Sequence, residues 1–210
     1  MPIDFVKKYK EYYMPPCRPV LVDVPRMNYI AVEDNGESDG EDDTRERAIK
    51  VLYAVAYTLS MSYLTDHRIE GFFRYEVPPL EIFWREGDGM YKGILYWIGA
   101  IRLPDFVSEE DFNWAVQTVA QEKGLDTGAV KFLTVDEGMC VQMTYVGQLK
   151  DDLQDPFSHL SQMYEYAREN GFDTDVINGR QVYHWIYLDD PRRTAPGKCR
   201  TVLRIGVKHK

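Results

Sequence analysis

Apolar and polar positions alternate in short runs along the chain, and these runs predict strands that are separated by helices. The first strand is expected at Met27–Glu33, and the apolar spacing of Thr44–Tyr63 predicts an amphipathic helix. An aromatic hairpin follows, with strands at Leu80–Trp84 and Ile94–Leu103 on either side of the polar, glycine-containing segment Arg85–Gly93. The first half of the chain therefore has the order strand, helix, strand, strand.

The same order of elements recurs in the second half of the chain. Strands are predicted at Lys131–Val135 and Gly138–Val146, and Asp155-Pro156 is typical of a helix start, with a helix that runs to about Asn170. Two further strands, Val182–Leu188 and Thr201–Val207, close the chain. Recurring groups of elements indicate the fold, because each group buries its apolar face against its neighbour.

A helix predicted at Ser108–Gly124 joins the two halves, and Ser108 with Asp111 resembles a capping box. We expect an α+β fold of duplicated βαββ repeats, about residues 27–103 and 131–207, related by pseudo-twofold symmetry. The repeats would form an antiparallel sheet with helices on one face and a ligand pocket on the other. Residues 1–19 are expected to form an N-terminal arm, and residues 20–210 a single ligand-binding domain.

Composition and charge exclude several classes of protein. The net charge of −9 argues against direct nucleic-acid binding, which needs clustered basic residues. Three cysteines form no CxxC pair and no zinc-binding pattern, so no metal is expected, and the odd count suits a reducing compartment. No glycine-rich nucleotide motif indicates a cofactor. Without a signal-peptide core or a run of about 20 apolar residues, we expect a cytoplasmic protein with no membrane contact.

Aromatic residues supply the candidate chemistry, since the chain has 15 tyrosines and four tryptophans. The predicted hairpin places Glu81 close to Trp84 in sequence, and a buried carboxylate is costly unless it is paired or neutral. Two interpretations remain open at this point. Glu81 lies on a solvated face of the sheet, or it belongs to a pocket for an apolar or cationic ligand.

The repeat suggests equivalent positions in the two halves. If the strands around Phe83 and Tyr187 are equivalent, Glu81 matches Trp185 and Phe83 matches Tyr187. Tyr53 and Tyr57 are one helical turn apart and share a helix face. They are either core residues or part of a helix that packs against a pocket.

Four segments carry a resemblance to a known family. They are Pro78–Trp84, Ile101–Val107, Ile186–Thr194 and Thr201–Arg204, which read PPLEIFW, IRLPDFV, IYLDDPRRT and TVLR. With these segments, residues 20–210 resemble the GyrI-like small-molecule-binding family. The resemblance implies two βαββ repeats around a pseudo-twofold axis, with a pocket near the axis for flat, often cationic, aromatic compounds.

Only about twenty residues precede the part of the chain that resembles the family, so a stand-alone branch is expected rather than a regulator with a helix-turn-helix region. That branch resembles the cyclopropanoid cyclopropyl hydrolases, which open the cyclopropane of DNA-alkylating natural products such as yatakemycin. Many relatives have a glutamate where this chain has Trp185. The chain therefore lacks a second pocket carboxylate and has a larger stacking surface instead.

The resemblance implies a site in which an aromatic slot holds the substrate. The expected ligand-binding residues are Trp84, Trp97, Trp185, Tyr53, Tyr57 and Phe83. Glu81 would orient the attacking water, and Tyr145 or Tyr187 would donate a hydrogen bond to the carbonyl oxygen as it gains negative charge. The alternatives are a non-catalytic binder or sensor of planar drugs, and a gyrase-interacting protein, for which the acidic segment Glu33–Asp43 is the only support. The sequence leaves the oligomeric state open.

Overall fold

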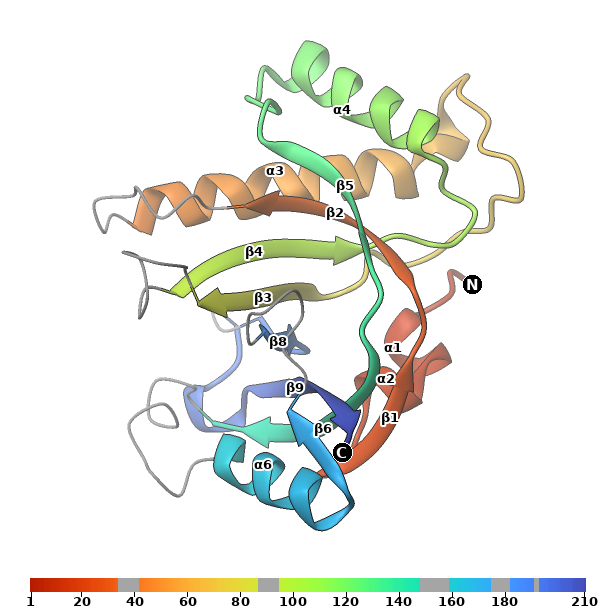
Figure 1. Ribbon diagram of the computed structural model, residues 1–210. Helices are drawn as coiled ribbons and strands as arrows, with labels where there is room; N and C mark the ends of the chain where they lie inside the picture. Colours follow the sequence, from red (N-terminus) through yellow and green to blue (C-terminus); the bar gives the residue numbers. More distant parts are fainter. Residues whose placement is uncertain (34–41, 87–94, 148–158, 175–181, 191–192) are drawn as a thin grey trace.

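A curved antiparallel sheet organises the protein (Figure 1). The computed structural model describes residues 1–33, 42–86, 95–147, 159–174, 182–190 and 193–210. The strands in these ranges are β1 (Val20–Val24), β2 (Met27–Glu33), β3 (Leu80–Glu86), β4 (Leu95–Arg102), β5 (Val130–Val135), β6 (Gly138–Val146), β7 (Phe172–Thr174), β8 (Val182–Tyr187) and β9 (Arg200–His209). They lie in the order β1-β6-β9-β8-β3-β4-β2-β5, and β7 pairs with β9.

The sheet has two halves that meet where β3 pairs with β8. Outward from this junction, β3, β4 and β2 are followed by β5, and β8, β9 and β6 are followed by β1. Helix α3 (Asp42–Ser60) packs on β2 and β4, and α6 (His159–Glu169) packs on β6 and β9. Helix α4 (Glu109–Lys123) lies against α3, farther from the sheet (Figure 1). Each half therefore contains a strand, a helix and two strands in chain order.

Both α3 and α6 cover the same face of the sheet, which we call the helix face. Ile30 and Ile101 pack with α3 there, and Met143 and Leu203 pack with α6. Side chains alternate between the two faces of a strand. The expected α+β fold, with an antiparallel sheet and helices on one face, is confirmed.

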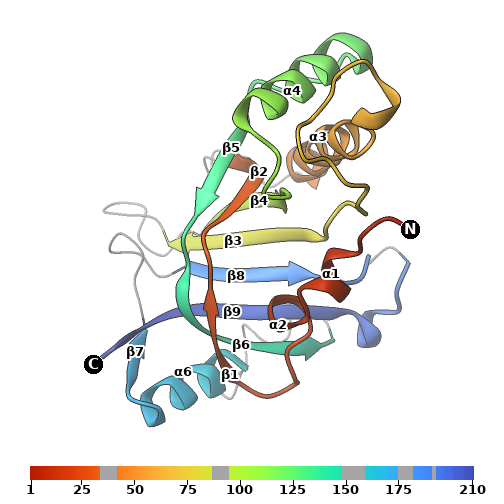
Figure 2. The same ribbon diagram turned by 90° about the vertical axis from the view of Figure 1, so that its right-hand side faces the viewer.

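The opposite face is closed by the start of the chain, so we call it the arm face. The short helices α1 (Phe5–Lys8) and α2 (Lys10–Tyr13) lie there (Figure 2). Tyr13 is buried against Ile186 and Val202 in the centre of the sheet. The amide of Gln142 donates to the Glu11 carbonyl at 2.6 Å. The predicted pocket on this face is therefore wrong, because the arm, with α1 and α2, fills that side.

Local sequence signals explain several boundaries. The Ser108 hydroxyl accepts from the backbone N–H of Asp111, and the Asp111 carboxylate accepts from the backbone N–H of Ser108 at 3.0 Å, so the predicted capping box is confirmed. Gly124 ends α4 with a φ of 60°, a left-handed conformation that glycine adopts without strain.

The elements that the sequence did not predict are short. They are β1, β7, α1 and α2. The expected helix start at Asp155-Pro156, most of the acidic segment and residues 87–94 of the hairpin lie outside the described residues. Between α3 and β3, Tyr75 forms one isolated bridge with Ile3.

Candidate aromatic site

Trp84 lies at the centre of a group of aromatic side chains on the helix face. In the sheet, Trp84 pairs with Trp97 on β4 and with Tyr183 on β8. Trp185 follows Tyr183 by two residues on β8 and pairs with Ile82, so it is a diagonal neighbour of Trp84 on the same face. The two halves of the sheet thus each contribute a tryptophan to the junction between them.

The indoles of Trp84 and Trp185 contact each other, with ring centroids 5.2 Å apart and an interplanar angle of 58°. Trp185 is 8% exposed, and Trp84 is half-buried. Neither buried indole N–H meets a hydrogen-bond acceptor within the described part of the structure. A buried donor without a partner costs about 1–3 kcal/mol, so this pair of donors favours an acceptor supplied by a ligand or by water.

Two predicted tyrosines belong to the same face. Tyr187 on β8 and Tyr145 on β6 both pair with Thr201 on β9, so they lie two strands apart. Burial raises the pKa of the Tyr187 phenol to about 12, and the nearby Arg45 cation works in the opposite direction. Tyr145 packs edge-on against His159 at 4.7 Å. We call the set Trp84, Trp97, Trp185, Tyr145, Tyr183 and Tyr187 the aromatic face.

Trp97 is the least accessible member of the first half. It is 6% exposed beneath α3, and one of its ring carbons lies 2.7 Å from the position that a Cβ atom on residue 99 would occupy. The side chain of Leu52 on α3 approaches the same point. Trp97 therefore supports the aromatic face from within the core.

Arg45, near the start of α3, places a cation at this face. Its guanidinium carbon lies 5.3 Å from the centroid of the Trp84 ring and 5.4 Å from that of Trp97. Such distances are typical of cation–π contacts. The side chain is exposed, so the charge lies at the edge of the face. The sequence analysis missed Arg45, because nothing in the local pattern shows which strand the helix will contact.

Glu81 and Phe83 lie on the arm face, away from the tryptophans. Glu81 is 1% exposed, and its carboxylate accepts from the Tyr13 hydroxyl at 2.9 Å and contacts His184 Nε2 at 2.8 Å. Phe83 stacks on the His184 ring, with centroids 3.9 Å apart. The expectation that these two residues share a slot with the tryptophans is wrong, because odd sequence spacing from Trp84 sends them to the other side of β3.

The expected matches between the repeats fail for the same reason. Glu81 pairs with Ile186 on the arm face, whereas Trp185 faces the helices. Phe83 and Tyr187 are likewise on opposite faces. His184, which pairs with Phe83, is the residue of β8 that approaches Glu81.

A buried charge network continues from Glu81 across the arm face. His184 Nδ1 lies 3.0 Å from Glu137, and Arg204 donates to Glu137 at 2.9 Å. Burial alone would raise the pKa of Glu137, but the adjacent His184 and Arg204 charges hold it at about 2. Burial alone would lower the pKa of His184, yet Glu137 and Glu81 raise it above its ordinary value. Arg204 also donates to the Tyr12 carbonyl, so the network fastens the arm to the sheet.

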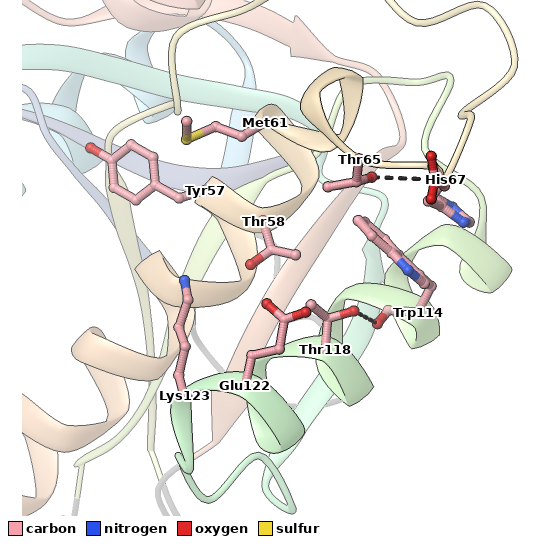
Figure 3. Close-up of a pocket in the computed structure, with 10 residues that line it drawn as sticks. Tyr57, Thr58, Met61, Thr65, His67, Trp114, Thr118, Glu122 and Lys123 are labelled. Atoms are coloured by element: carbon pink, nitrogen blue, oxygen red, sulfur yellow. Dashed lines mark hydrogen bonds between the residues drawn. The ribbon is translucent and has the colours of Figure 1, made fainter.

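Tyr53 and Tyr57 form a stacked pair on α3. Their rings stack with centroids 6.2 Å apart, and Tyr53 packs partly against the core under α3. Tyr57 is 51% exposed and lines a groove of about 340 Å³ between α3 and α4 (Figure 3). The predicted role of Tyr57 beside the tryptophans does not fit this placement, and the role of Tyr53 stays a prediction.

The groove between α3 and α4 has its own polar contacts. His67 Nε2 lies 2.8 Å from Asp111, and the His67 ring stacks on Trp114 with centroids 4.0 Å apart. Burial tends to raise the pKa of Asp111, but hydrogen bonds from Ser108 and His67 lower it overall. Asp111 already caps α4, so these contacts hold the helix start in place.

The described side chains include no group of three histidine, cysteine, aspartate or glutamate residues that is arranged to hold a metal ion. Within the same ranges, no helix is both long enough and apolar enough to cross a membrane.

The fold and the aromatic face together define an α+β protein with an antiparallel sheet of two halves and an aromatic cluster where the halves meet. Neither protein-family models nor curated proteins gave a match to the chain. Several solved structures match the chain. A hydrolase from Listeria innocua is 36% identical, with a TM-score of 0.84, and the alignment covers 99% of this chain and 100% of that one. An uncharacterized conserved protein from Listeria innocua is also 36% identical, with a TM-score of 0.83 and coverage of 98% and 100%. The chain belongs to the family of these Listeria proteins.

A further solved structure is more distantly similar. The C-terminal domain of EcmrR is 12% identical, with a TM-score of 0.52, and the alignment covers 92% of this chain and 98% of that domain. At this identity the likeness concerns the fold alone, and it is consistent with the GyrI-like fold that the sequence predicts.

Proposed function

We propose that the protein binds flat aromatic xenobiotics at its aromatic face and hydrolyses the cyclopropane of cyclopropanoid DNA-alkylating compounds. One observation carries the proposal: the indoles of Trp84 and Trp185 are in contact at the junction of the two halves, and each has a buried N–H without an acceptor among the described residues. The Listeria innocua relative that is described as a hydrolase supports the choice of an enzyme over a passive binder.

The chemistry requires a ring surface and hydrogen-bond donors. Water adds to a cyclopropane carbon, the strained carbon–carbon bond breaks, and its electron pair moves into the conjugated ring. The carbonyl oxygen becomes a phenolate that takes up a proton, while the added water loses one. Donors fixed near that oxygen stabilise the charge that develops in the transition state. The indole N–H groups of Trp84 and Trp185 and the Tyr187 hydroxyl are the donors proposed here.

Electrophilic activation is favoured over general-base catalysis. Glu81, the carboxylate expected to orient water, is buried on the arm face between Tyr13 and His184. Tyr187 keeps its proton at neutral pH, because burial raises its pKa to about 12, and can therefore donate. Ring strain already lowers the barrier, so positioning and charge stabilisation supply the remaining acceleration. We assign Tyr145, two strands from Tyr187, to the edge of the bound ring system.

A non-catalytic binder or sensor is the second candidate. The observation in its favour is that the described helix-face side chains of β3 and β8, from Leu80 to Trp84 and from Tyr183 to Tyr187, include no carboxylate and no histidine that could act as a general base. Of the acidic segment Glu33–Asp43 behind the gyrase alternative, residues 34–41 lie outside the described residues.

The test is multiple turnover by the purified protein. A cyclopropanoid compound in excess over protein is expected to gain one water by mass spectrometry, in an amount that exceeds the protein. Tyr187→Phe should reduce turnover about 10- to 100-fold while it leaves binding nearly intact, since one donor is lost. Tyr63→Phe, an exposed tyrosine outside the face, is the matched control and should behave as the wild type. Protection of the compound without product would favour the binder, and unchanged turnover in Tyr187→Phe would remove that donor from the mechanism.

A further inference from the structure

We infer that the aromatic face selects neutral or anionic flat compounds that carry a carbonyl oxygen, and that Arg45 excludes cationic ones. The inference rests on the proposed site and names the charge class of its ligands. It departs from the cationic compounds that the family resemblance leads one to expect. Three observations support the inference. Arg45 places a cation at the aromatic face, and the indole N–H groups of Trp84 and Trp185 have no acceptor among the described residues. The carboxylate of Glu81 lies on the opposite face of the sheet, the arm face.

The resident cation is Arg45. Its guanidinium carbon lies within 5.4 Å of the Trp84 and Trp97 ring centroids, so it already occupies the position that a ligand cation would take on these rings. Like charges at such separations repel, and the repulsion grows as burial lowers the effective dielectric constant. The Arg45 charge also acts to lower the pKa of the Tyr187 phenol, against the larger effect of burial.

The two indole donors demand an acceptor. Trp84 and Trp185 each bury an N–H that meets no acceptor in the described ranges, and their rings are in contact. A ligand cation such as a quaternary nitrogen accepts no hydrogen bond and leaves both donors unsatisfied. A carbonyl oxygen is an acceptor for such a donor, and the hydrogen bond removes the cost of burying the N–H.

Glu81, the carboxylate that could attract a ligand cation, lies away from the aromatic face. Glu81 lies on the arm face, where the Tyr13 hydroxyl and His184 hold both its oxygens. Among the described side chains of the helix face on β3 and β8, from Leu80 to Trp84 and from Tyr183 to Tyr187, none is a carboxylate.

Two matched, unreactive probes test the inference: acridone, which is neutral and carries a carbonyl, and N-methylacridinium, which is cationic and has the same three rings. Binding to the full chain is followed by quenching of tryptophan fluorescence. Acridone should bind at least about tenfold more tightly than N-methylacridinium, the equivalent of one well-made hydrogen bond. Tighter binding of the cation by the wild type would overturn the inference.

Variants separate the contributions of charge and hydrogen bonding. Arg45→Gln should strengthen N-methylacridinium binding about tenfold, and so reduce the ratio of acridone affinity to N-methylacridinium affinity. Lys50→Gln removes the same charge from an exposed position on α3 and should leave the preference unchanged. Trp185→Phe keeps a ring but removes one N–H, and should weaken acridone about fivefold more than N-methylacridinium. If the ratio of acridone affinity to N-methylacridinium affinity is the same in Arg45→Gln and the wild type, the proposal that Arg45 excludes cations is wrong.

The failure of this inference can be told apart from failure of the proposed function. If acridone is preferred but no cyclopropanoid is hydrolysed, the charge selection stands and the hydrolase is wrong. If turnover occurs and N-methylacridinium binds more tightly, the hydrolase stands and the charge selection is wrong. If neither probe binds, the aromatic face is not a ligand site and both are wrong.

Discussion

Replacing Glu81 with glutamine tests whether this carboxylate is structural or catalytic. The substitution keeps the side-chain volume and one oxygen that can accept from the Tyr13 hydroxyl. It removes a buried negative charge that lies 2.8 Å from His184, a residue that is itself 1% exposed. We therefore expect Glu81→Gln to destabilise the fold while the aromatic face keeps its geometry.

The magnitude follows from the burial of the pair. Breaking a buried ion pair by neutralising one partner costs about 3–5 kcal/mol. For Glu81→Gln we expect a loss at the lower end of this range, about 3 kcal/mol, because the hydrogen bond from Tyr13 is retained and Glu137 still pairs with His184. For a chain of 210 residues, a loss of about 1 kcal/mol lowers Tm by roughly 2–4 °C, so a decrease of about 6–12 °C is expected.

The assay combines denaturation with turnover on the same preparation. Urea and thermal unfolding at pH 6 give the loss of stability, and the mass-spectrometric assay at a temperature where the variant is folded gives the rate. Glu165→Gln, an exposed carboxylate on α6, is the control and should change Tm by less than about 2 °C. A Glu81→Gln protein as stable as the wild type but without turnover would refute the structural role and restore the catalytic one.

Three further outcomes concern packing, capping and pH. Gly99→Ala would place a methyl group 2.7 Å from a Trp97 ring carbon, so urea unfolding should show a loss of about 1–3 kcal/mol, against little change for Gly197→Ala, which has open space around it. Ser108→Ala removes the cap of α4 and should cost about 1 kcal/mol, with most of the loss restored by threonine at this position. Because its two carboxylate neighbours raise the pKa of His184, the folded state holds this proton more tightly than the unfolded chain, and stability should fall as the pH rises above about 6.5. Unfolding free energies that are flat between pH 6.5 and 8.5 would contradict the charged state of His184.

Most element boundaries could be predicted because they depend on local patterns. The strand at Met27–Glu33 is found with the predicted bounds, and the predicted hairpin strands match β3 and β4 to within two residues at each end. The capping box at Ser108 likewise needs only four consecutive residues. By contrast, β1 lies between two prolines and pairs with β6, more than a hundred residues away, so its partner gives no local signal.

The site was predicted in part, and the errors have a common physical origin. Trp84 and Trp185 do come together, because both lie on the strands that form the junction. Glu81 was expected beside them, but a shift of one residue in a strand moves a side chain to the other face. The contacts of Arg45 and of His184 with Glu137 depend on how a helix docks and how distant strands meet, which single-sequence patterns do not specify.

A crystal structure with a bound flat aromatic carbonyl compound, such as acridone, tests the central claim most directly. The account predicts the ring system on Trp84 and Trp185 on the helix face, with its oxygen within hydrogen-bonding distance of an indole N–H and with Arg45 at the edge. A ligand that instead lies beside Glu81 under the arm, or in the groove between α3 and α4 next to Tyr57, would contradict it.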